Sequence, residues 1–319
     1  MAFYIGVDIG GTNINVGVTD GTGNIVGEAE TPTGANRPQE AVIGDILSAA
    51  DRAVSAAGVL RREIFAAGVG CPGTVESSSG SVVYNNNLGW RDFPLGKLLS
   101  EAWGLPVRVE NDANAAALGE VCAGSARGAS SAMILTLGTG VGSGFVVEGR
   151  IWTGWNASAC EFGHMVIVKG GRLCTCGRRG CLEVYASATG LIDMTREAMA
   201  AHPESLMNAL AEREGRVGGH TAFAAAERGD AAALRVVDEY VDYLACGVTN
   251  IVNGLQPEVV GIGGGVGRQG DRLLAPLRQK VYAEVYGGRG ERFTRLTQCT
   301  LGYRAGLVGA AMAAMQSTV

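Results

Sequence analysis

The sequence predicts an α/β protein built from two similar halves. Two stretches, Phe3–Thr19 and Ala132–Val147, each show a strand, a glycine-rich turn and a second strand. Elsewhere, buried strands alternate with segments of helical spacing, which is the pattern of α/β folds. The chain has 319 residues and is 47% hydrophobic, so it is long and apolar enough for two domains with a large core.

Composition and charge exclude several classes of function. The net charge is −5 and the isoelectric point is about 5.4, which argues against a nucleic-acid partner, because such proteins need a basic face. No apolar run is long enough to span a bilayer, so no membrane partner is expected. Met1 leads directly into a strand without a basic, cleavable leader. We therefore expect a cytoplasmic protein whose eight cysteines are reduced or metal-bound.

The first glycine turn is D-I-G-G-T-N, Asp8–Asn13. Backbone N–H groups of Gly10 and Gly11, with the side chains of Thr12 and Asn13, are suitable donors to phosphate, and Asp8 can reach Mg²⁺ through water. No G-K-[ST] follows, so this is not a Walker A loop, and a strand rather than a helix follows, so it is not a Rossmann fingerprint. Taken alone, the turn fits an ordinary hairpin at least as well.

Two further glycine turns strengthen the phosphate interpretation. L-G-T-G-V-G at Leu137–Gly142, with Thr139 and Gly140 at its centre, repeats the design of the first turn in the second half of the chain. This echo predicts a duplicated α/β unit with a phosphate chain held between the two hairpins. Val259–Gly267 is a buried strand that runs into Gly263–Gly265, where a base or ribose can lie against backbone.

The remaining elements follow from apolar spacing and turn residues. A polar loop at Asn85–Trp90 suits a polyol, although a plain turn explains it equally well. The division we predict is a smaller domain of residues 1–118 with 302–319 and a larger one of 119–301, with a hinge near Asp112–Gly128. The expected elements are helices at Glu40–Gly58, Ala231–Leu255 (with a core stripe from Leu234 to Ile251), Asp271–Tyr282 and Gly306–Met315, and strands at Phe65–Cys71 and Leu105–Val109.

Asp112 has two interpretations. It lies in E-N-D-A-N-A-A-A-L-G-E, Glu110–Glu120, where Asn111 or Asp112 begins a helix. From this stretch alone, a helix cap is the simpler role. The alternative is a general base at a strand-to-helix corner, where the helix dipole favours the charged carboxylate. A weak base suffices for phosphoryl transfer, whose loose transition state depends mainly on positioning and charge stabilisation.

One segment carries metal-ligand spacing. His164, Cys174, Cys176 and Cys181 lie within eighteen positions, with Glu161 and Glu183 on either side. Free thiols and a disulfide are the alternatives, but a disulfide is unfavourable in a cytoplasmic chain. A Cys₃His set is typical of a closed, tetrahedral, structural Zn²⁺ site. We expect such a metal to bring the two carboxylates together in a sugar site.

These segments together resemble the ROK family of sugar kinases and repressors, and among them the bacterial glucokinases. The resemblance runs in family order along nearly the whole chain, and its most specific part is E-F-G-H followed by C-T-C-G-R-R-G-C-L-E. One departure is Cys160, where the family usually has Gly. The matching segments are Asp8–Asn13, Cys71–Val75, Asn87–Trp90, Glu110–Glu120, Leu137–Gly142, Glu161–His164, Cys174–Glu183 and Ile262–Val266.

The resemblance implies a two-domain actin-like (ribonuclease-H-like) fold with ATP and sugar in the cleft between the domains. It implies that Asp112 takes the proton from the sugar 6-hydroxyl as that oxygen attacks the γ-phosphate of ATP, with Mg²⁺. Phosphates would meet Gly10–Asn13 and Thr139–Gly140, and adenosine would meet Gly263, Gly264 and Gly265. The sugar would be bound by Gly73, Asn87, Asn111, Asp112, Glu161, His164 and Glu183, with His164 also a zinc ligand.

The expected reaction is ATP-dependent phosphorylation of glucose. N-acetylmannosamine and N-acetylglucosamine kinases share the sugar motif and remain alternatives. A sugar-responsive repressor is a different class, and it needs a DNA-binding domain where only seven residues precede Asp8. A silent sugar-binding protein is disfavoured by Asp112 and the two hairpins. The resemblance also implies a homodimer or homotetramer.

Overall fold

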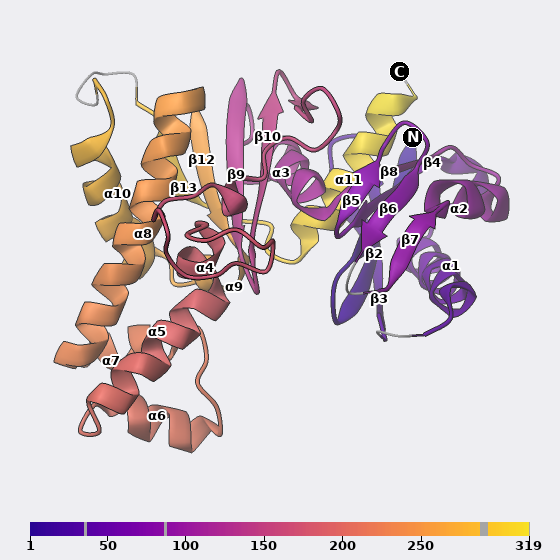
Figure 1. The fold of residues 1–319 in the computed structure, drawn as a ribbon. Helices are drawn as coiled ribbons and strands as arrows, with labels where there is room; N and C mark the ends of the chain where they lie inside the picture. The colour runs from indigo at the N-terminus through magenta and orange to yellow at the C-terminus, as the bar shows by residue number, and fades with distance from the viewer. Residues whose placement is uncertain (35–36, 86–87, 288–292, 319) are drawn as a thin grey trace. The chain divides into compact units, whose positions relative to one another are not determined.

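The chain forms two compact units in the computed structural model, which describes residues 1–34, 37–85, 88–287 and 293–318 (Figure 1). The first unit comprises Met1–Ile134, Gly144–Cys160 and Thr300–Val319, and the second comprises Leu135–Ser143 and Glu161–Cys299. The chain thus first leaves the first unit after Ile134, later than the division we predict at residue 118. It returns for the last time between Cys299 and Thr300.

The first unit is built on a five-stranded sheet in the order β3-β2-β1-β4-β8. Strands β1, β2 and β3 pair antiparallel, whereas β4 and β8 run parallel to β1. A three-stranded sheet, β5-β6-β7, lies in the same unit. The bounds are β1 Phe3–Ile9, β2 Asn13–Asp20, β3 Ile25–Pro32, β4 Ile64–Cys71, β5 Thr74–Glu76, β6 Ser81–Asn85, β7 Trp90–Phe93 and β8 Val107–Asn111.

Helices cover both faces of this sheet. Gly6 and Gly17 are paired across β1 and β2, and a Cβ on either would strike Leu307 of α11. A Cβ on Gly27, in β3, would strike α1 instead. Gly27 pairs with Val18, which follows Gly17 and so points to the opposite face. Helices α1 and α11 therefore lie on opposite faces (Figure 1). The helices are α1 Gln39–Ala57, α2 Leu95–Trp103, α3 Asp112–Ala123 and α11 Arg304–Ser317, with a 3₁₀ turn η1 at Arg61–Glu63.

Contact between α11 and its neighbours is direct, backbone to backbone. A Cβ on Gly68 of β4 would lie 1.8 Å from the carbonyl oxygen of Ala310, and one on Gly309 would lie 1.6 Å from that of Ala115 in α3. Only glycine permits such approach. The C-terminal helix thus packs on the N-terminal sheet, and these glycines define its position.

The second five-stranded sheet repeats the order of the first, as β11-β10-β9-β12-β13. As in the first sheet, the edge strand β11 pairs antiparallel with β10, and the last two strands, β12 and β13, pair parallel. The repetition is that of a duplicated unit. The bounds are β9 Ser131–Leu137, β10 Val141–Val147, β11 Arg150–Ile151, β12 Val259–Gly263 and β13 Arg295–Gln298.

Helices of the second unit pack around α8, whose observed bounds, Ala231–Leu255, are those predicted. Asp230 caps it by accepting from the N–H of Ala233. The predicted core stripe is wrong at its start, because Leu234 is 50% exposed. It borders a hollow of about 360 Å³ between α7, α8 and α10. The other helical elements of the second unit are η2 Phe162–His164, α4 Glu183–Ala186, α5 Ala188–Ala201, α6 Leu206–Glu214, α7 Thr221–Ala226, α9 Gly264–Gly267 and α10 Asp271–Glu284. Within the described ranges, no helix is long and apolar enough to cross a membrane.

The close approach of α11 predicts an asymmetric effect of two Gly→Ala substitutions. Gly68→Ala forces β4 and α11 apart and should lower the free energy of unfolding by about 3 kcal/mol or more, since overpacking a rigid core commonly costs 1–3 kcal/mol. Gly44→Ala, in α1 with no atom within 4 Å of the new Cβ, should stabilise by about 0.5–1 kcal/mol. Urea unfolding of both variants checks this, and equal midpoints would contradict the packing.

Candidate active site

Three neighbouring parallel strands end together in the first unit. Asp8 of β1 is in register with Gly70 of β4, and Cys71 is in register with Asn111 of β8. A Cβ on Gly70 would lie 3.6 Å from Asp8 Oδ1 and 3.7 Å from the Cα of Asp112. The two acidic residues therefore flank one glycine at the carboxyl ends of the strands, where α/β sheets bind their ligands.

The structure separates the roles of Asn111 and Asp112. Asn111 is the N-cap of α3, because its Oδ1 accepts from the N–H groups of Ala113 and Asn114 at 2.9 and 3.1 Å. Asp112 occupies the first helical position. The Nδ2 of Asn111 donates to the carbonyl oxygen of Gly73 at 3.1 Å. Asn111 is thus the cap residue, and the Oδ1 of Asp112 also accepts from the N–H of Ala113 at 2.9 Å, so Asp112 lies as an acid in the first turn of the helix.

Asp8 is electrostatically unusual. Burial, and secondly the nearby charge of Asp112, raise the pKa of Asp8 from the ordinary value of 3.8 to about 7. Gly306 of α11 leaves room for this carboxylate, since a Cβ there would lie 2.5 Å from Asp8 Cγ. Cys71, the last residue of β4, is fully buried, and burial raises the pKa of its thiol to about 12. Two carboxylates this close favour a cation between them.

The first glycine turn has the predicted hairpin geometry. The N–H of Gly10 donates to the carbonyl of Asn13 at 2.9 Å, while Gly11, Thr12 and Asn13 are exposed at the tip. Thr33 holds the turn from outside: its hydroxyl donates to the carbonyl of Gly10 at 2.7 Å and its N–H to that of Thr12 at 2.8 Å. An exposed, braced turn with open N–H groups suits phosphate.

The second and third glycine turns meet in the second unit. A Cβ on Gly264, which has a φ of +78°, would lie 2.5 Å from the backbone of Leu137, immediately before the second turn. Gly263 ends β12, and Gly264 and Gly265 begin the short helix α9, where the sequence suggests a simple turn. The hydroxyl of Thr189 donates to the carbonyl of Thr139 at 2.8 Å and fixes the second turn.

The predicted metal ligands come together. The ligand atoms of His164, Cys174, Cys176 and Cys181 all lie within 4.8 Å of one another. The Cys176 and Cys181 sulfurs are 3.7 Å apart, and Cys174 Sγ is 3.6 Å from His164 Nδ1. Tetrahedral bonds of 2.3 Å to sulfur place two sulfurs about 3.8 Å apart, so these spacings fit Zn²⁺. The cluster can hold a metal ion.

Glu183 connects this cluster to the second glycine turn. Its Oε2 accepts from the N–H of Val141 at 3.1 Å, and its Oε1 lies 3.6 Å from Cys174 Sγ. A Cβ on Gly140 would lie 2.3 Å from Oε2, so a larger residue there would displace this carboxylate. Burial raises the pKa of Glu161; the charge of His164 lowers this pKa, and the charge of Glu183 raises it further. Glu183 thus lies beside both the cluster and the second glycine turn.

The model of the ROK family matches residues 4–317 of this chain. The chain belongs to the ROK family. A glucokinase from Halalkalibacterium halodurans is 40% identical over 310 residues, covering 96% of this chain and 93% of that protein. A ROK glucokinase from Streptomyces griseus, solved with glucose and AMPPNP, has a TM-score of 0.84 at 34% identity, covering 99% and 100% of the two chains. A ROK hexokinase from Thermus thermophilus has a TM-score of 0.81 at 34% identity, covering 99% of each. The two-domain actin-like sugar-kinase fold is confirmed.

Some residues that position the candidate site are not found by sequence reasoning. Thr33 carries no local signal, because it lies beyond β3 and meets the turn only after folding. Asn85 has a weak signal, a buried amide at the end of β6, where its Nδ2 donates to the carbonyl of Pro72 at 2.8 Å. Ser143 accepts from the N–H of Phe162 at 3.0 Å and ties β10 to the E-F-G-H segment. Asn87, which the resemblance assigns to the sugar, lies outside the described residues.

Cys160 departs from the ROK pattern in a conformation that favours glycine. Its φ is +68°, a left-handed value that costs a non-glycine residue roughly 1–2 kcal/mol. The side chain is buried, and its Sγ lies 3.7 Å from the carbonyl oxygen of Trp152. The family's usual glycine at this position therefore has a backbone reason, and the present chain carries strain immediately before Glu161.

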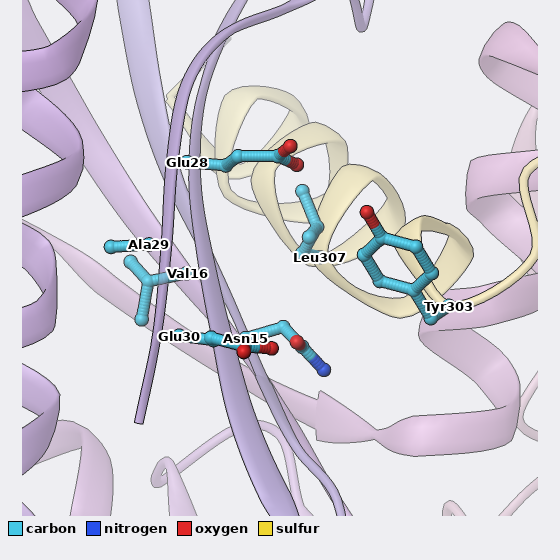
Figure 2. A pocket seen from close by; sticks show the side chains of 7 residues that line it. All are labelled: Asn15, Val16, Glu28, Ala29, Glu30, Tyr303 and Leu307. Carbon is cyan, nitrogen blue, oxygen red and sulfur yellow. The ribbon is translucent and has the colours of Figure 1, made fainter. Parts of the chain in front are cut away.

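A separate hollow of about 310 Å³ lies on the first sheet beside α11 (Figure 2). Glu28 and Glu30 contribute from β3, and Tyr303 and Leu307 from the α11 side. Arg304 neutralises Glu28 with two contacts of 2.6 and 3.0 Å. The carboxylates on its strand side make this hollow unsuited to phosphate.

The pKa of Asp8 predicts a pH-dependent stability difference. Because the folded pKa is raised, the native state binds a proton more tightly than the unfolded state, and stability is lost as pH rises from about 4 through about 7. The Asp8→Asn variant has no group that ionises at this position. Its free energy of unfolding should therefore increase relative to that of the wild type as the pH rises through this range. Urea unfolding without Mg²⁺ measures it, with the exposed Asp51→Asn as control. A difference independent of pH would refute the shift.

Proposed function

We propose that this ROK protein is a kinase that transfers the γ-phosphoryl group of ATP to the 6-hydroxyl of glucose. The observation that carries the proposal is the pair Asp8 and Asp112, which lie on either side of Gly70 at the end of β4, with Asn111 as the cap residue of α3. The matched relatives include a glucokinase and a structure with glucose and AMPPNP. Asp112 is the general base of the proposed reaction.

The proposed chemistry is a direct displacement. The glucose 6-hydroxyl oxygen forms a bond to the γ-phosphorus while the bond from that phosphorus to the ADP oxygen breaks and ADP keeps the electron pair. The hydroxyl proton passes to Asp112. Charge stabilisation and alignment supply most of the rate, as is general for phosphoryl transfer. The glycine turns at Gly10–Asn13 and Thr139–Gly140 bind the phosphates, and Gly263–Gly265 contacts the adenosine.

Asp8 holds the cation side of the site. Mg²⁺, when bound with the nucleotide, neutralises charge developing on the β- and γ-phosphates. With a pKa of about 7, Asp8 is partly protonated near neutrality and would have to lose that proton to hold a cation. The carboxylate of Asp8 is then available to bind the cation through water, while Asp112 remains with the sugar.

The second unit recognises the other hydroxyls. Glu161 and Glu183 accept hydrogen bonds from sugar, and His164 donates from Nε2, because its Nδ1 faces the thiol cluster. His164, Cys174, Cys176 and Cys181 would hold Zn²⁺, and the bound metal would fix these groups in place. A Cys₃His set is typical of a structural site, so the role we give the metal is structural. Side chains built to pair with hydroxyls reject analogues that lack them.

Removing the base tests the mechanism. Asp112→Asn should lower kcat by roughly 10²-fold or more with a much smaller change in the glucose KM, because general-base catalysis typically contributes 10²–10⁴-fold. A coupled ADP-release assay measures this over glucose, mannose, N-acetylmannosamine and N-acetylglucosamine, with Asp51→Asn as a matched surface control. Turnover of the variant equal to wild type would sink the role of Asp112. Preference for an N-acetylhexosamine would replace glucose as the substrate.

Metal analysis tests the zinc assignment. The purified protein should hold about one zinc per chain, as four protein ligands close one tetrahedral site. Cys176→Ser should reduce folding yield or glucose affinity far more than AMPPNP affinity, whereas Cys246→Ser, a half-buried thiol on α8, should retain the zinc. Zinc near zero in an active wild-type sample, or loss of nucleotide affinity alone in Cys176→Ser, would contradict the assignment.

A further inference from the structure

One buried acid has no role in the proposed reaction. Glu120 lies at the opposite end of α3 from Asp112 and is fully buried. No ion pair joins it to a cation in the described part of the chain. A carboxylate near a helix C-terminus also opposes the helix dipole. Burying an acid in these conditions is unfavourable unless hydrogen bonds satisfy it.

Four hydrogen bonds do so, and every one is donated to the carboxylate. Oε2 accepts from the N–H of Ser125 at 2.7 Å, from the Ser125 hydroxyl at 2.8 Å and from the N–H of Thr300 at 3.1 Å. Oε1 accepts from the N–H of Leu301 at 2.8 Å. A Cβ on Gly124 would lie 2.2 Å from Oε2, so the loop after α3 folds around this group. The two carboxylate oxygens of Glu120 thus serve as acceptors for all four of these bonds.

Two of the partners of Glu120, Thr300 and Leu301, lie where the chain returns to the first unit, which it does between Cys299 and Thr300. The residue before that peptide bond, Cys299, contacts the end of β12, next to the turn that we propose for adenosine. Its N–H donates to the carbonyl of Ile262 at 3.0 Å, and a Cβ on Gly263 would lie 3.2 Å from its Sγ. Glu120 therefore holds one end of a connection whose other end contacts the proposed adenosine turn.

We propose that Glu120 is a positioning residue for phosphoryl transfer, which ties the segment after Cys299 to the helix that carries Asp112. The proposal rests on the function proposed above. Helix α3 then has the base at its first residue and the anchor of the returning chain near its last. Phosphoryl transfer is sensitive to such alignment, because a misplacement of about 1 Å can cost a factor of roughly 10² in rate.

The isosteric change Glu120→Gln tests this. The amide NH₂ cannot accept from the donors that face it, so the anchor loosens without a change in volume. We expect kcat to fall roughly 10- to 100-fold, with less than about a 3-fold change in glucose affinity measured without nucleotide. Glu120→Asp, which restores an acceptor-only group, should recover part of the loss. Ser125→Ala, which removes one of the four donors, should stay near wild type.

Two controls separate positioning from folding. Val42→Ala truncates a buried residue of α1 and should lower Tm while leaving kcat unchanged in the folded protein. If it lowers kcat as much as Glu120→Gln at an equal loss of Tm, the proposal fails. It also fails if Glu120→Gln loses Tm but keeps wild-type kcat.

Hydrogen exchange gives a readout independent of turnover. The amides of Thr300 and Leu301 should exchange faster in Glu120→Gln than in wild type, and AMPPNP with glucose should slow them in wild type. Absence of both effects would overturn the inference even in an active enzyme. An inactive wild type that still shows both would refute the proposed function and leave the anchor standing.

Discussion

The position of α11 is the constraint on which the site depends. Glycines at positions 68 and 309 let its backbone touch β4 and α3, and Gly306 leaves the space that Asp8 fills. Because the helix cannot move outward without losing these contacts, β1, β4 and α3 are held at one separation. That separation keeps Asp8 buried beside Asp112, and burial, followed by the charge of Asp112, raises the pKa of Asp8. The packing of α11 against β4 and α3 thus fixes the surroundings of the carboxylates at the strand ends.

A second constraint organises the other unit. The His164 and cysteine cluster lies beside Glu183, and Glu183 bonds to the N–H of Val141 in the second glycine turn. One carboxylate therefore joins the metal-type cluster to a phosphate-type turn. A side chain at position 140 would meet the same carboxylate, so the cluster, Glu183 and the turn are packed together.

Local signals in the sequence predict most of the elements, and distant contacts account for what they miss. The helix Ala231–Leu255 is predicted to the residue, because Asp230 caps it and its apolar spacing is regular. The small β5-β6-β7 sheet is not predicted, since its strands are only 3, 5 and 4 residues long. The metal ligands are predicted because they lie close in sequence. The partners of Glu120 are not, because Thr300 is 180 residues away. The choice of Asn111 as cap also needs the folded backbone, since either neighbour suits that position.

The central claim is direct transfer of phosphate from ATP to the 6-hydroxyl of glucose. The most direct measurement is ³¹P and ¹³C NMR of the product formed from ATP and ¹³C-labelled glucose. The account predicts phosphate on carbon 6 in a one-to-one ratio with ADP. Phosphate on carbon 1, or inorganic phosphate released in step with ADP while glucose stays unmodified, would contradict it.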